Sequence, residues 1–351
     1  MTSRRPKSTS SSPPNPHRSS GRFQNNYSEF EPKSLADVLK WRLAAARAGL
    51  PRAPQVPTPR VAPDLAFILS NGNAKTAMAP AATWIGHASV LLQMGGSNLL
   101  VDPVFSARAS PFSFVGPKRH VAPGLTLDEL PRIDAVLISH NHYDHLDAPS
   151  VEALARQGGG PPLFVVPLGL EAWLADRGIT HAVELDWWQA TCVGALEVVC
   201  TPSQHWSSRS LGDRMKTLWG GFAIFAPDFH AFYAGDTAYS KDFRDAHVHF
   251  AARHGGAVRG FDLALLPIGA YEPRWFMSPQ HVNPAEAVKI HLDILAARSI
   301  GIHWGTFQLT DEPLDEPPRA LVEAVRAKGL AVDAFTVMAV GETRRFARRL
   351  P

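Results

Sequence analysis

Short apolar runs recur along the chain from about residue 89, and each run ends in polar or small residues. Two of them, 89–94 and 98–102, are separated by Gly95, Gly96 and Ser97 and predict a β-hairpin. Five later runs also predict strands, and each delivers His, Asp or Gly at its end: 133–139, 195–200, 231–234, 264–268 and 299–302. Helical patterns lie between several of the runs, for example at 149–156 and 284–297. The alternation predicts an α/β fold, and no internal repeat is visible.

The N-terminal part has a different composition. The first twenty residues hold seven Ser and four Pro but one apolar side chain, Met1, so they cannot bury enough surface to offset the entropy of ordering. We predict a disordered, basic tail over residues 1–21. A helix that Ser34 caps and Pro51 ends follows, and apolar side chains recur on one of its faces: Leu35, Val38, Leu39, Leu43 and Ala46. We expect residues 22–351 to form one domain with this helix as an extension.

Charge is distributed unevenly along the chain. Eight of the 35 Lys and Arg lie in the first twenty and last eight residues, which leaves 27 basic against 32 acidic side chains in the body. A nucleic-acid-binding protein needs a basic surface to release counterions from many phosphates, so no nucleic-acid partner is expected. Cys192 and Cys200 cannot build a disulfide framework, and neither a secretory signal nor a membrane-spanning apolar segment occurs. We therefore expect a cytoplasmic protein that can still contact a membrane peripherally.

The most distinctive chemistry follows the first predicted strand after the hairpin, where residues 140–145 read His-Asn-His-Tyr-Asp-His. Alternation along an extended chain lets His140 and His142 point the same way, while Asp144 and His145 in the next turn can face a second centre nearby. Imidazole and carboxylate are the ligands that Zn²⁺ favours, and four such groups so close together repel one another unless a cation lies between them. The motif therefore predicts a metal site. The alternative is a polar turn at the surface.

This motif cannot complete two metal sites by itself, so further ligands are expected at other strand ends. Three side chains that follow predicted strands fit this role: His205, Asp236 and His303. Any one of them alone is more often a hydrogen-bonded structural residue. Together with the motif they complete a set of seven candidate ligands.

The order of these seven residues resembles the metallo-β-lactamase superfamily, in its dinuclear hydrolase branch. Within that branch, the flanking segments resemble the N-acyl-phosphatidylethanolamine-hydrolysing phospholipase D family. These segments are 83–89, 102–106, 109–111, 116–119, 138–147, 273–277, 280–282 and 302–307. The resemblance runs from about residue 22 to about residue 345. It identifies the body of the chain as a hydrolase domain.

The resemblance implies a four-layer αβ/βα sandwich of two mixed β-sheets flanked by helices, with two zinc ions at one edge. The family's pattern implies how the ligands share the ions: His140, His142 and His205 on one zinc, Asp144, His145 and His303 on the other, and Asp236 between them. The bridging role agrees with the chemistry of the residue, because a carboxylate has two oxygens and an imidazole offers one nitrogen to a metal.

Further site residues follow from this assignment. The cations would supply hydroxide at neutral pH, so no nucleophilic Ser or Cys is needed, but the leaving alkoxide needs a proton or a positive neighbour. His281 is the candidate for that role, with Gln280 beside it as a substrate-binding residue, and Tyr143 would bind phosphate through a free hydroxyl. Asp102 would accept the free N–H of a ligand His. The catalytic candidates are thus Asp144, His281 and Tyr143, and a structural role is the alternative for the last two and for Asp102.

The expected function is phospholipase D-type hydrolysis of N-acyl-phosphatidylethanolamine to N-acylethanolamine and phosphatidic acid, with phospholipids or other phosphodiesters as substrates. A lactonase or thioesterase of the same fold, or a non-catalytic membrane-associated metal-binding protein, stays open as an alternative. The stretch 105–123 suits a membrane surface, because Phe112 and Phe114 stand close to Lys118 and Arg119. A homodimer stays open as an assembly of this chain.

Overall fold

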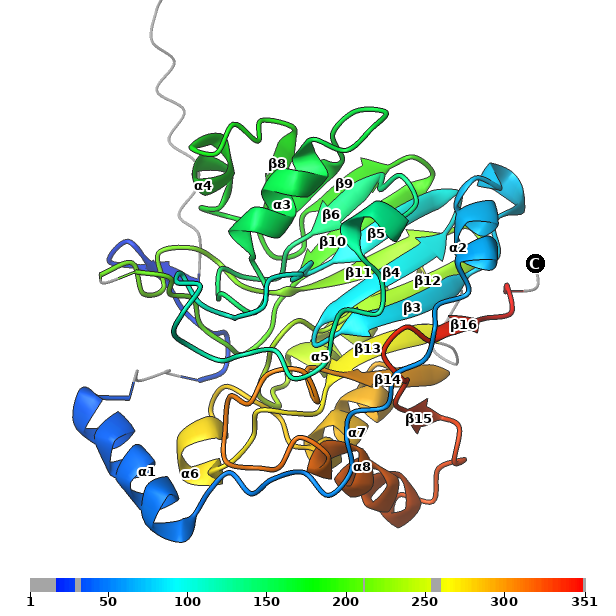
Figure 1. Cartoon of the computed structure of the whole chain (residues 1–351). Coiled ribbons are helices and arrows are strands. Elements are labelled where there is room, and N and C mark those ends of the chain that lie inside the picture. The colour runs from blue at the N-terminus through cyan, green and yellow to red at the C-terminus, as the bar shows by residue number, and fades with distance from the viewer. Residues whose placement is uncertain (1–16, 29–32, 211, 254–259, 350–351) are drawn as a thin grey trace, which may run out of the picture.

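Two seven-stranded mixed sheets lie face to face in the computed structural model, and helices cover the outer face of each sheet (Figure 1). The structure describes residues 17–28, 33–210, 212–253 and 260–349. The four-layer αβ/βα sandwich expected from the sequence is confirmed.

The first sheet has the strand order β16-β3-β4-β5-β6-β7-β8. Its strands are β3 (Ala81–Gly86), β4 (Ser89–Met94), β5 (Ser97–Val101), β6 (Ala135–Leu137), β7 (Leu163–Pro167), β8 (Ala182–Leu185) and β16 (Thr343–Arg345). β4 and β5 form the predicted hairpin, and the strands from β5 to β8 run parallel.

The second sheet has the order β15-β14-β13-β12-β11-β10-β9. Its strands are β9 (Ala190–Val193), β10 (Leu196–Thr201), β11 (Gly221–Ala226), β12 (Phe229–Tyr233), β13 (Leu263–Pro267), β14 (Arg298–Ile302) and β15 (Phe335–Thr336). The strands from β12 to β15 run parallel and the others antiparallel, as in the first sheet. The five strands predicted after the hairpin all form within a few residues of their expected bounds.

Alternate side chains of each strand face either the core between the sheets or the helices outside them. In β4, Val90 and Leu92 point into the core between the sheets, whereas Leu91 packs under the outer helices. The helices on the first sheet are α2 (Leu65–Gly72), α3 (Ala148–Ala155) and α4 (Glu171–Ala175), with the short turns η1 (Lys75–Ala77) and η2 (Leu127–Glu129). Those on the second sheet are α5 (Asp242–Phe250), α7 (Pro284–Asp293) and α8 (Glu316–Ala327). None of the helices in the described part of the chain combines the length and hydrophobicity of a membrane-spanning segment.

The start of the chain departs from its prediction. Residues 1–16 of the expected disordered tail lie outside the described residues, but 17–21 belong to a small hairpin of β1 (Arg18–Ser19) and β2 (Arg22–Phe23). For these five residues the prediction of disorder is wrong. The reason is Phe23, two residues after this stretch, which is buried in the core between the sheets and anchors the segment.

The N-terminal helix α1 (Leu35–Ala48) begins where it was predicted, but most of its predicted apolar face is exposed. Ser34 caps it in a capping box with Asp37, and Gly49 in the left-handed conformation ends it before Pro51. The buried side chains are Trp41 and Ala45, which pack on α6 (Arg274–Met277). The three leucines of the predicted apolar face point outward instead: Leu35, Leu39 and Leu43 are 83%, 69% and 52% exposed, whereas Val38 of that face packs on the same cluster.

Candidate metal centre

Strands of both sheets end at one edge of the sandwich, and the predicted ligands follow those ends. β6 leads into residues 140–145, and β10, β12 and β14 lead to His205, Asp236 and His303. Because β12, β13 and β14 are parallel and in register, their carboxyl ends meet at this edge. The structure therefore brings all seven predicted ligands together, five of them almost fully buried.

The turn that carries the motif is held from the side by an arginine. Residues 140–147 leave the sheet in a turn in which Leu146 N–H donates to the carbonyl of His142 at 2.8 Å. The guanidinium of Arg209 donates to the carbonyls of Asn141 and Leu146 at 2.9 and 2.7 Å. Burial lowers the pKa of Arg209 to about 10, so it stays charged at neutral pH. Two ligand-bearing loops are thereby joined.

Three imidazoles form the first group of candidate ligands. Nε2 of His140 lies 2.8 Å from Nδ1 of His142, which lies 3.3 Å from Nε2 of His205. The other nitrogen is held in two of the rings: Nδ1 of His140 by Oγ of Ser139 and Nδ1 of His205 by the carbonyl of Gln280, both at 2.9 Å. Burial lowers the pKa of His142 to about 3 and that of His205 to about 4, so their lone pairs are free at neutral pH.

Asp144, His145 and His303 form the second group, and a residue that the sequence reasoning did not assign joins them. Around Oδ2 of Asp144 lie three imidazole Nε2 atoms: that of His87 at 3.0 Å, that of His303 at 3.3 Å and that of His145 at 3.6 Å. Spacings of this size are those expected between ligands of one metal ion with bonds of about 2.1 Å.

Asp236 stands between the two groups. Its Oδ2 lies 3.1 Å from Nε2 of His145 and 3.2 Å from Nε2 of His303 in the second group. The same oxygen lies 3.9 Å from Nε2 of both His140 and His205 in the first. One buried carboxylate therefore contacts nitrogens of both sets.

The electrostatics of the centre fit divalent cations. Nε2 of His145 and Oδ1 of Asp236 are buried and have no hydrogen-bond partner in the described part of the chain. Burial alone would lower the pKa of His145, but Asp236, Asp144 and Asp102 outweigh it and hold that pKa well above its ordinary value. The same two imidazoles, His145 and His303, hold Asp236's pKa well below its ordinary value against the effect of burial. A cation that displaces the protons of His145 and His303 would balance the charges of Asp144 and Asp236.

Asp102 orients a ring of each ligand group. Its carboxylate accepts Nδ1–H of His145 at 2.6 Å, the N–H of Ser139 at 2.7 Å and the hydroxyl of Ser139 at 2.5 Å. The hydroxyl of Tyr233 donates to it as well. Because Ser139 Oγ also meets Nδ1 of His140, Asp102 acts on His145 directly and on His140 through the serine.

His281 and Gln280, two further predicted site residues, contact the centre in different ways. Nδ1 of His281 lies 3.9 Å from Oδ2 of Asp236 and is buried without a hydrogen-bond partner among the described residues. The side chain of Gln280 instead donates to the sulfur of Met277 at 3.3 Å, so its contact with the centre is through its main-chain carbonyl.

The prediction that the hydroxyl of Tyr143 is free is wrong. This hydroxyl donates to the carbonyl of Arg209 at 2.8 Å, and the guanidinium of the same arginine lies 4.0 Å from the centre of the tyrosine ring. The physical reason is the loop after His205, which folds back over the motif turn. The ring of Tyr143 still lines a cavity of about 380 Å³ together with Arg209 and Phe112.

His87 is the residue at the centre that sequence reasoning missed. It follows Gly86 at the end of β3 in a left-handed conformation, with φ of 55°. Its N–H donates to Oγ1 of Thr306 at 2.7 Å, and its ring centre lies 4.1 Å from that of His303. A His directly after a strand was the available signal, the same one that pointed to His205 and His303.

An apolar loop adjoins the cavity beside Tyr143. Phe112, which lines that cavity, is 54% exposed, and Phe114 is 77% exposed; their ring centres lie 5.6 Å apart. Arg119 in the same stretch is directed inward and donates to the carbonyls of Val104 and Ser106. The loop therefore exposes two aromatic side chains near its tip.

Comparisons with known proteins agree with this geometry. The family described as the β-lactamase superfamily domain matches residues 97–304. An uncharacterised protein of Mycobacterium tuberculosis is 40% identical over 300 residues, which cover 84% of this chain and 75% of that protein. The N-acyl-phosphatidylethanolamine-hydrolysing phospholipase D 1 of Caenorhabditis elegans is 39% identical over 272 residues, which cover 74% of each chain. The crystal structure of an isothiocyanate hydrolase from Delia radicum gut bacteria shares the fold, with a TM-score of 0.59 and 21% identity over 76% of this chain and 99% of that one.

Proposed function

Because the chain belongs to the β-lactamase superfamily of metal-dependent hydrolases, we propose that it is a dinuclear zinc phosphodiesterase that cleaves N-acyl-phosphatidylethanolamine to N-acylethanolamine and phosphatidic acid. The observation that carries the proposal is the position of Asp236, whose carboxylate contacts nitrogens of both ligand groups. The activity in the name of the similar Caenorhabditis elegans protein supports the choice of substrate.

In this proposal the seven predicted ligands divide between the two groups. His140, His142 and His205 hold one zinc, Asp144, His145 and His303 hold the other, and Asp236 lies between them. When bound, two such cations supply hydroxide at neutral pH and neutralise the negative charge that develops on the phosphoryl oxygens. Asp102 keeps the proton of His145 on Nδ1, so that Nε2 faces the ion.

His281 is proposed to assist the leaving group. Its ring centre lies 5.1 Å from that of His205 and 5.6 Å from that of His303, at the rim of both ligand groups. Burial lowers the pKa of His281 well below its ordinary value, so its neutral imidazole would stabilise the leaving oxygen through an N–H hydrogen bond, while water would supply the proton. Its side chain is 12% exposed, which leaves it within reach of a substrate.

The acyl chains of the lipid have a matching surface beside the centre. Phe112 connects the exposed apolar loop to the cavity next to Tyr143. Since the hydroxyl of Tyr143 is bonded to Arg209, we assign its ring rather than its hydroxyl to substrate contact. An exposed aromatic pair at this place favours a substrate drawn from a membrane surface over a small polar ester.

The test is an assay of zinc-loaded protein against three substrates: N-acyl-phosphatidylethanolamine in mixed micelles, a lactone and a thioester. We expect turnover of the phospholipid and formation of phosphatidic acid. In ¹⁸O-labelled water the label should enter the phosphatidic acid, because attack occurs at phosphorus. Label in the released alcohol contradicts the mechanism. Rapid opening of the lactone without phosphodiester turnover makes the protein a lactonase instead. A His140→Ala variant, which lacks a ligand, is the inactive control.

A further inference from the structure

His205 is presented by a segment without regular structure. Between β10 and β11, residues 202–210 and 212–220 form neither helix nor strand, and Gln204 makes a single isolated bridge to Ala238. His205 is nevertheless buried. Buried backbone N–H and C=O groups need hydrogen-bond partners, and a segment outside helices and sheets does not supply them from its own ladder. Something else must satisfy and fix the main chain at this position.

Asn25 supplies those partners from the N-terminal segment. Its Oδ1 accepts the N–H of His205 at 3.0 Å, and its Nδ2 donates to the carbonyl of the same residue at 3.0 Å. Oδ1 also accepts the indole N–H of Trp219 at 3.1 Å. One side-chain amide thus pairs with both backbone groups of a candidate ligand that lies 180 positions later.

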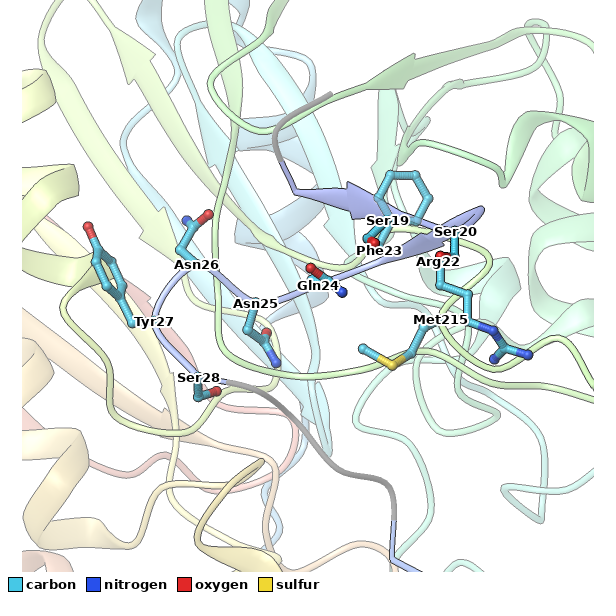
Figure 2. Close-up of a pocket in the computed structure, with 10 residues that line it drawn as sticks. All are labelled: Ser19, Ser20, Arg22, Phe23, Gln24, Asn25, Asn26, Tyr27, Ser28 and Met215. Carbon is cyan, nitrogen blue, oxygen red and sulfur yellow. The ribbon is translucent and has the colours of Figure 1, made fainter. Parts of the chain in front are cut away.

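The segment that carries Asn25 is fixed on both sides of it, and Figure 2 shows its course between Ser19 and Ser28, with Met215 nearby. On one side, Phe23 is buried in the core, and its N–H donates to the carbonyl of Met215 at 2.8 Å. On the other, Nδ2 of Asn26 donates to Oδ1 of Asp242 at 2.8 Å, and the hydroxyl of Tyr27 donates to Asp245. Both aspartates belong to α5. The segment therefore connects the loop of His205 to a helix of the second sheet.

The chemistry of this contact requires an amide. Asparagine places a donor and an acceptor side by side, which matches the N–H and C=O of one residue. Aspartate has the same shape but two acceptors, so one of its oxygens would face the carbonyl of His205 with like charge. Alanine leaves both backbone groups of His205 without these partners.

We propose that Asn25 is a positioning residue for the metal centre, which sets the main chain of His205 so that its Nε2 meets the first ligand group. The ring of His205 is then held by two elements: its backbone by Asn25 and its Nδ1 by the carbonyl of Gln280. The inference rests on the proposed assignment of His205 as a zinc ligand. It makes residues 22–28 part of the centre although no ligand lies among them.

The test compares Asn25→Asp and Asn25→Ala with Gln24→Ala, a control on the neighbouring exposed residue. Stepwise zinc affinity is measured by competition with a chromophoric chelator, and the absorption bands of Co²⁺-substituted protein report the geometry of each site. We expect a 10- to 100-fold loss of affinity for one ion, with altered Co²⁺ bands for that ion alone. The second ion, held by Asp144, His145 and His303, and the Gln24→Ala variant should bind as the wild type does.

The outcomes separate this inference from the proposed function. Two ions bound with wild-type affinity in both Asn25 variants overturn the inference and leave the dinuclear proposal intact. Equal weakening of both ions together with a lowered melting temperature also overturns it, because Asn25 would then be a structural residue only. If the alanine variant does not fold, the aspartate variant decides, since it preserves the volume of the side chain. A wild-type protein that binds fewer than two ions contradicts the proposed function itself.

Discussion

Replacing Asp102 by Asn is the most informative single change at the metal centre. Asp102 touches no proposed metal ion, yet four donors converge on its carboxylate: the N–H and the hydroxyl of Ser139, Nδ1–H of His145 and the hydroxyl of Tyr233. Asparagine keeps the shape but replaces one acceptor oxygen by an NH₂ group and removes the charge. The variant therefore tests whether this carboxylate holds the ligands in place.

The size of the effect follows from the contacts. The hydroxyls of Ser139 and Tyr233 and Nδ1–H of His145 all meet Oδ2, so the amide oxygen takes that position and the NH₂ faces the N–H of Ser139. An unsatisfied buried donor costs about 1–3 kcal/mol, and each bond that loses its charged acceptor weakens by about 1 kcal/mol. The metal-free protein should lose about 4–6 kcal/mol of stability. A less well oriented His145 should lower the affinity for the second ion by about 10- to 100-fold.

Two measurements check this prediction. Urea denaturation of metal-free protein gives the change in the free energy of unfolding, and chelator competition gives the two zinc affinities. Asp134→Asn is a matched control at the opposite end of β6, where Asp134 accepts the N–H of Asn98 at 2.9 Å. It should lower stability without changing either affinity. The reasoning is refuted if Asp102→Asn leaves both affinities unchanged, or if Asp134→Asn lowers them equally.

Four further predictions concern single changes. Asp236→Asn should lower the content of both metal ions, because an amide bridges poorly; two equivalents by elemental analysis would contradict the dinuclear centre. His281→Ala should reduce phosphodiester turnover about a hundredfold at unchanged zinc content because it removes the N–H donor, whereas loss of zinc would make His281 a ligand. Removal of residues 1–16 should leave folding, zinc content and turnover intact, and precipitation would show that the tail is structural. Burial holds the pKa of His291 at about 4, below its ordinary 6.5, so the unfolded chain binds the extra proton between these values. Stability should fall as the pH drops from 6.5 to 4, by about 3 kcal/mol from this group, and the fall should be that much smaller in His291→Gln.

Several features of this protein were readable from the sequence because they depend on neighbouring residues. Apolar runs gave the strands, since a buried strand needs apolar side chains over a short stretch. The spacing of His140, His142, Asp144 and His145 is likewise local, so one strand end and its turn present all four groups. His205, Asp236 and His303, the other proposed ligands, were found by one general rule, that polar residues at strand ends gather at one edge of a fold.

The orientation of α1 shows where a local pattern falls short. Ser34 capped the helix as predicted, because capping involves residues three positions apart. The periodic leucines, however, face outward, and Trp41 reaches Asp311 with its indole N–H at 2.8 Å. Periodicity identifies an apolar face, but whether that face is buried depends on elements from distant parts of the chain.

The contacts that complete the centre belong wholly to the tertiary structure. Asn25 meets His205, His87 meets Asp144, and Tyr143 gives its hydroxyl to Arg209 across separations of 180, 57 and 66 positions. Each joins a loop or a strand end to another one, where no repeat in the sequence marks the partner. A hydrogen bond depends on positions within a few tenths of an ångström, and the packing of the two sheets and their loops sets those positions. The sequence therefore determined which groups bind metal in the proposal, while the packed fold decided what holds them in place.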